Sequence, residues 1–425
     1  MYIIPLTFFM CLSLKASDID DLIKKGDFST FHQYEQDLER SIMNDALDEI
    51  TKSTILKKLG KIHFYLTNYQ RAADYLERYL ELQPEDPQIQ AYLGAVYDEL
   101  SKHEQAQILL EQSIHFYHEN PSDDCSNLAF SLMHLGKTLS QQGQYQKAEE
   151  VLLESINQYH HSPSKENKEK AQTLLAETYM YKGDYKKAEP YFKSVIEQYE
   201  AESKPAIWTE LRLGRLYMFT GEYEQAASIF EKGISYLKEG EIIDYDKLGW
   251  NLFYLGDIYR SLGHFKKAHQ MMQEGFEAFQ RCGYDSYHQI IQWGNGYLGR
   301  LLCEEGHFER ALTLLEKSLF VHEEKYGKDS KRNVFIMQAL ANTYAKHKKY
   351  DEAEQLFQRS LSVYEKQFGK DHTEYALVLK DYGIFFYEKK DISTARGYVE
   401  TALNILTLHQ HSAMFDCKIL LEKMV

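Results

Sequence analysis

Proline, glycine and paired cysteines are scarce in this sequence. Of 425 residues only 7 are proline and 23 are glycine, whereas 44% are hydrophobic. That balance excludes collagen-like and disordered chains, because a core can be buried and few loops are encoded. A single core stops growing well below this length, so we expect either two or three domains or one extended array.

The five cysteines and 17 histidines form no recognisable site. The cysteines have no Cys-x-x-Cys pair and no paired spacing: Cys11, Cys125, Cys282, Cys303 and Cys417. A disulfide framework and a zinc site both need such spacing. The histidines also lack the spacing of metal ligands, so the sequence predicts no metal and no cofactor.

Positive charge and long apolar runs are missing as well. The chain has 49 basic and 64 acidic residues, a net charge of −15, and no local basic patch. Phosphate backbones would repel such a chain, which argues against a nucleic-acid partner. No apolar run approaches the length of about 18 residues that marks a membrane-spanning helix, so no transmembrane segment is predicted.

The first residues differ in character from the rest. An apolar run from Tyr2 to Leu14 is followed by Ala16 and by an acidic segment that starts at Asp18. This order is typical of a secretory signal, although no lysine or arginine precedes the run. We interpret residues 1–17 as a signal peptide and expect export to the periplasm or out of the cell. The alternatives are an apolar helix that caps the first repeat and a cytoplasmic protein.

A repeat accounts for the chain after residue 50. Small residues in a Leu-Gly or Leu-Ala setting recur at spacings of 34 to 43 residues: Gly60, Gly94, Gly136, Ala176, Gly214, Gly256, Gly299, Ala341 and Gly383. An alanine follows each of them after twelve residues: Ala72, Ala106, Ala148, Ala188, Ala226, Ala268, Ala311, Ala353 and Ala395. Such phase agreement in nine copies indicates one supersecondary unit that is repeated along the chain.

Two further positions identify that unit as a helical hairpin. Three residues before the alanine stands an aromatic residue in seven copies: Tyr69, Tyr145, Tyr185, Tyr223, Phe265, Phe308 and Tyr350. Two residues before the aromatic stands a glycine in five copies: Gly143, Gly183, Gly221, Gly263 and Gly306. Glycine can end a helix in the left-handed conformation, and the small residues let two helices approach closely. One hairpin cannot bury its apolar face alone, so neighbouring hairpins must stack.

These residues resemble the tetratricopeptide repeat over roughly residues 50 to 410. The last periods of 42 residues are similar to the longer repeats of kinesin light chains, as in the segment Tyr350–His372. One departure is Thr373, where that pattern has proline, and no heptad coiled coil precedes the array. The resemblance implies an all-α fold, a right-handed superhelical solenoid of about nine helix-turn-helix repeats.

The domain organisation follows from this assignment. Residues 18–52 are interpreted as N-terminal helices of a degenerate repeat, residues 53–409 as nine repeats, and residues 410–425 as a capping helix. That helix carries apolar residues at helical spacing: Phe415, Ile419, Leu420 and Met424. We expect this apolar face to cover the exposed end of the array.

No enzyme is predicted, because no convergent set of titratable groups is found. The stretch Gly294–Gly299 matches the glycine pattern of a dinucleotide-binding loop. That loop needs a preceding strand and a βαβ unit, which this chain lacks. Gly299 is already explained as the small residue of the seventh repeat.

The resemblance implies a concave groove lined by the first helix of each repeat. The position six residues before the small residue is occupied by Trp208, Trp250, Trp293 and Phe335 in four successive repeats. Other groove positions in this region carry further candidates: Arg215, Phe219, Arg260, Arg300 and Asn342. The rings are interpreted either as packing between repeats or as ligand anchors, and the arginines either as ligand contacts or as partners of Asp257 and Glu304.

The expected function is that of a non-catalytic scaffold that binds a protein or peptide in this groove. A ligand with carboxylates and an apolar anchor would suit the cations and aromatic rings. The alternative is a regulator that changes the shape of its superhelix when a signalling peptide binds and then acts on a separate effector.

Overall fold

The computed structural model of the chain describes residues 35–36, 38–40, 42, 48–122, 125–160, 165–240, 243–409 and 411–424. All regular secondary structure in these ranges is helical, which confirms the all-α prediction. The interpreted signal peptide and most of residues 18–52 lie outside the described residues. No helix among the described residues has the length and apolar character needed to cross a membrane.

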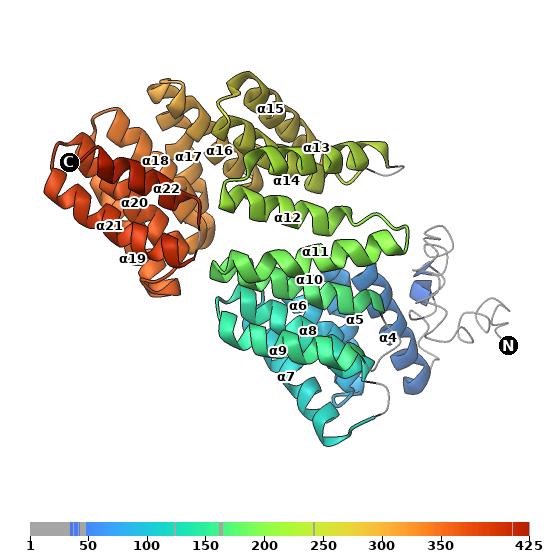
Figure 1. Cartoon of the computed structure of the whole chain (residues 1–425). Coiled ribbons are helices and arrows are strands. Elements are labelled where there is room, and N and C mark those ends of the chain that lie inside the picture. Colours follow the sequence, from blue (N-terminus) through green and yellow to red (C-terminus); the bar gives the residue numbers. More distant parts are fainter. Residues whose placement is uncertain are drawn as a thin grey trace. The chain divides into compact units, whose positions relative to one another are not determined.

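Successive helices pair as nine hairpins within the described residues from Glu49 to Leu408 (Figure 1). The first helices are α4 (Glu49–Tyr65), α6 (Pro87–Glu99), α8 (Ser126–Gln141), α10 (Lys165–Lys182), α12 (Ile207–Thr220), α14 (Tyr245–Ser261), α16 (Gln289–Glu304), α18 (Val334–Lys346) and α20 (Thr373–Glu388). The second helices are α5 (Tyr69–Leu82), α7 (His103–Glu119), α9 (Tyr145–His160), α11 (Tyr185–Ala201), α13 (Tyr223–Glu239), α15 (Phe265–Arg281), α17 (Phe308–Tyr326), α19 (Tyr350–Phe368) and α21 (Ile392–Leu408).

Every second helix begins at the aromatic position of the repeat or at its equivalent. Two residues earlier the backbone is left-handed in all nine hairpins. Five of these positions are the predicted glycines, with φ between 74° and 86°. The other four are non-glycine residues with φ between 58° and 64°: Thr67, Ser101, Lys348 and Lys390. The turn therefore requires the left-handed conformation even where the residue type disfavours it.

The small residues lie where the two helices of a hairpin cross. A Cβ atom added to Gly60 would be 2.3 Å from Leu76 Cδ2, and one on Gly299 would be 2.5 Å from Leu315 Cγ. The alanines of the second helices are fully buried, including Ala226 and Ala268. The predicted close approach is confirmed, because each leucine fills the space that a larger residue would need.

The chain divides into two compact units, and the division falls within α10, between Thr178 and Tyr179. In unit 1, α4 contacts α6 and α6 contacts α8; in unit 2, α14 contacts α16, α16 contacts α18, and α18 contacts α20. First helices that touch across repeats lie on the inner, shorter side of a curved stack. One continuous array over residues 53–409 stays a prediction.

The last helix, α22 (Ala413–Glu422), packs against α20 and α21. Ala413, Cys417 and Met424 are buried there. Phe415 and Ile419 are 54% and 51% exposed. Of the four apolar residues expected to cover the array, Leu420 and Met424 pack against its core. For Phe415 and Ile419 the expectation is wrong, because the smaller Ala413 and Cys417 make the contact instead.

Candidate functional site

Three aromatic rings on successive first helices of unit 2 form a continuous stack, the aromatic ladder, which consists of Trp250, Trp293 and Phe335. Trp250 and Trp293 meet edge to face with centroids 6.1 Å apart, and Trp293 stacks on Phe335 at 5.0 Å and 6°. All three rings are half-buried. Trp250 also packs against Phe279 of α15 at 5.5 Å. The ladder therefore combines packing within the repeats with exposed ring surface.

The glycines of α16 make room for these rings. A Cβ atom on Gly296 would lie 2.7 Å from Phe335 Cε1, and one on Gly294 would lie 2.7 Å from Phe253 Cζ. Both glycines are inside a regular helix rather than in a loop after a strand. The pattern Gly294–Gly299 is thus a packing feature of the ladder and its core.

A buried group of charges lies beside the ladder. The Arg260 Nε donates to Asp257 Oδ1 at 2.7 Å, and its Nη1 donates to Glu304. Arg300 Nη1 lies 3.6 Å from Asp257 Oδ2, and its guanidinium is 5.5 Å from the centroid of Phe335. Burial raises the pKa of Asp257, but the charges of Arg300 and Arg260 outweigh it and hold that pKa below its usual value.

Arg260 and Arg300 therefore differ in what they can offer a ligand. Arg260 is only 9% exposed and is paired on two sides, so its charge is used within the protein. Arg300 is about one-third exposed and contacts both the ladder and Asp257. Of the two, Arg300 has the geometry of a ligand contact. The partners interpreted from sequence, Asp257 and Glu304, are the observed partners.

Three further predicted site residues lie on α12 and α18. Trp208, on α12, is 42% exposed, with Lys247 Nζ 4.7 Å above its ring. Arg215 lies over Tyr181 and Tyr254, at 6.0 and 5.4 Å from the ring centroids. The Asn342 side chain donates to Asp381 Oδ2 at 2.9 Å.

Comparison with known families identifies the repeat. Tetratricopeptide repeat models match residues 87–159, 291–366 and 333–407, and a further one matches residues 56–86. A model described as the MalT-like TPR region matches residues 159–326. The chain belongs to the tetratricopeptide repeat family. The similarity to kinesin light chains in particular stays a prediction, and the comparison with curated proteins gave no match.

Solved tetratricopeptide-like structures share the fold at low sequence identity. A Rap protein in complex with competence and sporulation factor has a TM-score of 0.60 and 11% identity, and the match covers 95% of this chain and 99% of that one. The apo quorum sensor NprR from B. thuringiensis has a TM-score of 0.59 and 12% identity, with 84% and 98% covered. Aspartyl phosphate phosphatase F from Bacillus subtilis has 0.54 and 15%, with 87% and 97% covered. At these identities the likeness shows the fold alone.

Sequence reasoning missed a second set of aromatic rings in unit 1. They lie on α4, α6 and α8, the first helices of three successive hairpins. This unit 1 cluster consists of Phe64, Tyr92, Phe130 and His134. Tyr92 lies 4.8 Å from Phe130, which lies 4.4 Å from His134, while Phe64 meets Tyr92 edge to face at 5.3 Å. Of the four, only Phe130 occupies the repeat position of the ladder, so the pattern in phase could not reveal the cluster.

Burial in this cluster has a clear electrostatic effect. It lowers the pKa of His134 to about 3, with the nearby Lys137 acting in the same direction. The Nδ1 atom of His134 is buried and has no hydrogen-bond partner. A neutral imidazole is therefore the form that fits among the rings.

Sequence reasoning also missed a set of contacts between the two ends of unit 2, which we name the latch. It joins Tyr181 and Phe219, near the ends of α10 and α12, to His372 and Ser412. His372 Nε2 lies 2.9 Å from the Tyr181 carbonyl oxygen, and the Ser412 hydroxyl donates to the Phe219 carbonyl oxygen at 3.0 Å. These pairs are 191 and 193 residues apart in sequence, so no local pattern could predict them.

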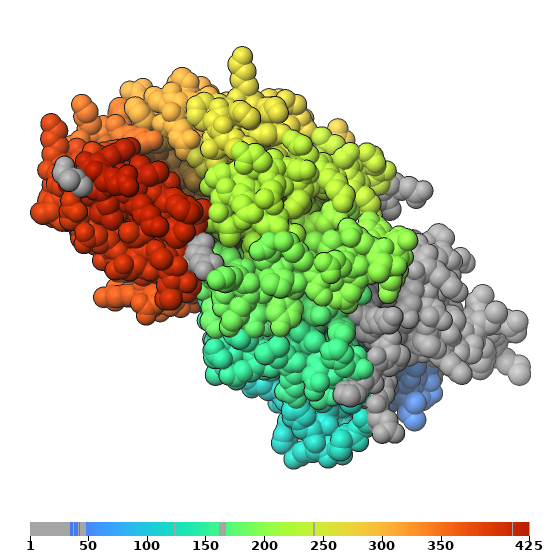
Figure 2. Space-filling view, in the orientation of Figure 1, coloured from blue at the N-terminus to red at the C-terminus, as the bar shows by residue number. Residues whose placement is uncertain are grey.

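Aromatic contacts complete the latch. The Tyr185 ring lies 5.9 Å from Phe219 and 5.7 Å from His411, and both Tyr185 and His411 are buried. The space-filling view shows the C-terminal helices, in red, in contact with the green segment of α11 and α12 (Figure 2). Phe219, predicted as a groove residue, thus belongs to this closing contact.

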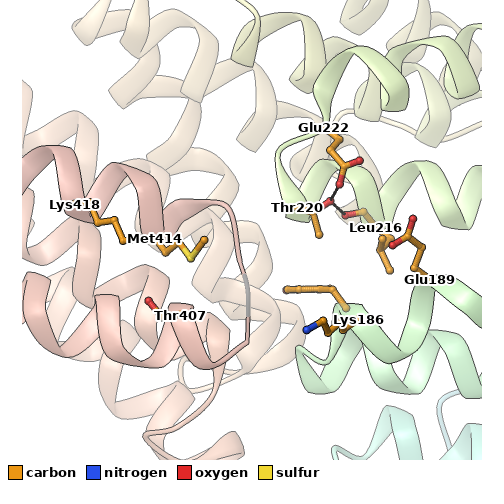
Figure 3. Close-up of a pocket in the computed structure, with 9 residues that line it drawn as sticks. Lys186, Glu189, Leu216, Thr220, Glu222, Thr407, Met414 and Lys418 are labelled. Carbon is orange, nitrogen blue, oxygen red and sulfur yellow. Dashed lines mark hydrogen bonds between the residues drawn. The ribbon is translucent and has the colours of Figure 1, made fainter.

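A cleft of about 450 Å³ lies beside the latch (Figure 3). Its walls come from both ends of unit 2: Tyr185, Lys186, Glu189, Leu216, Thr220, Glu222, Thr407, Met414 and Lys418. Glu189 accepts a hydrogen bond from Tyr217, and Glu222 accepts one from Thr220. At the cleft, the residues of α11 and α12 are therefore separated from those of α21 and α22.

One group of side chains in unit 1 has the composition of a metal site. Ligand atoms of Glu35, Glu39 and His63 lie within 4.8 Å of one another. Arg71 contacts both carboxylates, at 3.0 and 3.4 Å, and the Tyr75 hydroxyl donates to Glu39 at 2.9 Å. An ion would have to displace these donors, so the group is better explained as an ion-pair network that ties Glu35 and Glu39 to the first hairpin.

Proposed function

We propose that this tetratricopeptide repeat protein is a non-catalytic scaffold that binds a protein or peptide on the inner face of unit 2. The ligand carries an apolar anchor that lies on the aromatic ladder and a carboxylate that pairs with Arg300. The ladder is the observation that carries this proposal, because its rings are rigidly held yet half exposed.

Binding energy at a protein interface is concentrated in a few residues. Tryptophan and arginine are enriched among the residues that dominate binding, and they act best where packing holds them in place. Trp293 is fixed between Trp250 and Phe335, so a ligand would not have to immobilise it. Arg300 adds a cation at the edge of the same surface.

A regulatory role is the second candidate. Among the structures that share this fold, one is the quorum sensor NprR and another is a Rap protein in complex with competence and sporulation factor. These structures are consistent with a regulatory role for this chain. In that role, its inner face would respond to a signalling peptide, and the protein would act on a separate effector. The latch supplies an element of unit 2 whose state could differ between free and bound forms.

The proposal of a non-catalytic role concerns this chain and not its neighbours. One structure with the same fold is titled an aspartyl phosphate phosphatase. In the chain described here, the buried ionisable groups near the ladder are paired with each other, as Asp257 is with Arg260 and Arg300. Groups held in this way stabilise the repeats and are not poised to transfer a proton.

The test is a selection from a displayed library of random peptides on the purified chain at pH 7.5. We expect enriched sequences to contain aspartate or glutamate next to a large apolar residue. All three tryptophans of the protein lie in this region, so intrinsic fluorescence follows binding directly. Peptides that bind a Trp250→Ala, Trp293→Ala double variant as tightly as the wild type would disprove the site.

We also propose that the protein is exported, on the basis of the apolar run Tyr2–Leu14 and Ala16. N-terminal sequencing of the protein from its native host tests this. Cleavage after Ala16 or Ser17 would support export, and an intact N-terminus on soluble cytosolic protein would contradict it.

A further inference from the structure

The latch satisfies two equivalent backbone groups of successive repeats. Tyr181 and Phe219 each stand two residues before the left-handed glycine of their turn, Gly183 and Gly221. Carbonyl groups at the end of a helix have no partner within the helix and must find one elsewhere. In unit 2 these two carbonyls receive His372 and Ser412 from the other end of the unit.

The two glycines also provide the space that the latch needs. A Cβ atom on Gly221 would lie 2.6 Å from Ser412 Cβ, and one on Gly183 would lie 2.8 Å from Thr373 Cγ2. At Gly306, the same repeat position in another hairpin, an added Cβ would meet nothing within 4 Å. The close approach is therefore specific to the two repeats that receive the C-terminal segment.

We propose that the latch is a reversible closure that acid opens, and that it sets the curvature of the inner face of unit 2. Its consequence for binding rests on the proposed function, since the first helices that carry the aromatic ladder span the interval between the two latched ends. The closure itself is independent of any ligand.

Two histidines make the latch sensitive to protonation. The His372 ring presents Nε2 to the Tyr181 carbonyl and accepts the Glu374 backbone N–H with Nδ1 at 3.1 Å. His411 accepts the Ala413 backbone N–H with Nδ1, also at 3.1 Å. An imidazolium carries a proton on both nitrogens and cannot accept a hydrogen bond. Protonation must therefore break one helix-capping contact at each histidine.

Burial opposes a positive charge at both positions. His372 stacks on Phe368 of α19 and is influenced by His409, which follows α21, and by Lys331 of the short 3-10 helix Lys331–Asn333. Burial is the main cause that lowers the pKa of His372 to about 4; the hydrogen bond to the Tyr181 carbonyl acts in the opposite direction but does not outweigh it. The adjacent Glu374 is buried too, and burial raises the pKa of its carboxyl.

His411 has a similar environment. It packs against Tyr185 of α11 and Phe219 of α12, and it is influenced by Lys380 of α20 and by His409. Burial lowers the pKa of His411 to about 3, and both cations act in the same direction. An exposed imidazole has a pKa of about 6.5. The closed state is thus fully stable above that value and loses stability as pH falls from about 6.5 toward 4.

The first experiment measures hydrogen exchange at the Ser412 amide, which donates to the Phe219 carbonyl. After correction for the intrinsic pH dependence, we expect at least tenfold faster exchange at pH 5 than at pH 7.5. In a His372→Asn, His411→Asn variant, which keeps an acceptor at both caps without a titrating group, the ratio should fall below twofold. An unchanged rate in the wild type, or an equal response in the variant, would overturn the proposal.

A second experiment uses glycine variants at pH 7.5, where no protonation is involved. Gly221→Ala and Gly306→Ala place alanine at nearly the same φ, 83° and 85°, so both bear a similar backbone strain. Only Gly221→Ala introduces the clash with Ser412. We expect at least tenfold faster exchange at Ser412 in Gly221→Ala and less than twofold change in Gly306→Ala. Equal effects in the two variants would contradict a specific closure.

The binding consequence is measured separately with a peptide selected on the wild-type chain. Its affinity should fall at least tenfold in Gly221→Ala and stay within twofold in Gly306→Ala. An equal affinity for the two variants would refute the role of the latch in setting the inner face. If no peptide is selected, the proposed function fails, whereas the exchange experiments still decide whether acid opens the latch.

Discussion

The aromatic ladder of unit 2 and the unit 1 cluster are two solutions to the same packing problem. Both place aromatic rings on successive first helices; the ladder rings are all half-buried, whereas Tyr92 of the cluster is buried. The ladder uses one repeat position throughout and is flanked by Arg300, whereas the cluster draws its rings from different positions and encloses the neutral His134. Rings at the same repeat position contact one another from helix to helix and so extend along the array. Rings at different repeat positions instead gather around one side chain, His134.

In both units, the two helices of a hairpin should approach equally closely at the small residue of the repeat. Gly136→Leu in unit 1 and Gly299→Leu in unit 2 should each destabilise the protein by about 3 kcal/mol, because the new side chain collides with Leu152 or Leu315. Chemical denaturation measures this. The control is Gly397→Leu on an exposed part of α21, where an added Cβ meets nothing, and it should not destabilise. If either substitution left the free energy of unfolding unchanged, the hairpins of the two units would pack differently.

Ligand binding should separate the ladder from the cluster. Trp293→Ala should weaken the binding of a selected peptide by about 2 kcal/mol, roughly thirty-fold in Kd, as truncation of a central binding residue does. Phe130→Ala, at the same repeat position in unit 1, should leave the affinity unchanged. Fluorescence anisotropy with a labelled peptide measures both. A loss of stability in Trp293→Ala without a loss of affinity per folded molecule would make the ladder a core feature only.

Acid should affect the cluster before it affects the charges beside the ladder. The pKa of His134 is lowered to about 3, so its contribution to stability is lost as pH falls below about 6.5, by about 1 kcal/mol between pH 6.5 and 5.5. The pKa of Asp257 is also lowered, so its ion pairs persist until pH falls below about 4. Hydrogen exchange in α8 and α16 at pH 6.5 and 5.5 measures the difference. His134→Phe should abolish the response in α8, and an unaltered response would assign it to another group.

The smallest predicted change in stability concerns the left-handed turns between the two helices of a hairpin. Thr67→Gly should stabilise the protein by about 1 kcal/mol, because a β-branched residue is strained at a φ of 58°. Gly263→Ala, the reverse change in unit 2, should destabilise it by a similar amount, since φ is 74° there and no clash arises. Thermal unfolding of both variants measures this. A loss of stability in Thr67→Gly would mean that the threonine side chain contributes more than its strain costs.

The hairpins could be predicted from the sequence because each rests on residues close together in the chain. Gly60 and Ala72 recur in phase, and the structure places both at a helix crossing. The left-handed turns at Gly143 and Gly221 were predicted for the same reason. The turns at Thr67 and Lys348 adopt that conformation against their residue preference, so only their place in the repeat identifies them.

The site was predicted only where it follows the repeat. Trp250, Trp293 and Phe335 were found by phase, and the structure shows that they touch. The degree to which Arg260 is buried was not predictable, because it depends on Glu304 in the next repeat. The contact between His372 and Tyr181 depends on the curvature of several hairpins together, which no single repeat encodes.

That contact also bears on the order in which unit 2 folds. Hairpins form from residues that are near in sequence and lose little chain entropy when they close, so they assemble early. The latch joins residues 191 and 193 positions apart and can form only after the intervening hairpins have stacked. We therefore expect the latch to close last when unit 2 folds and to open first when it unfolds, with the hairpins still intact.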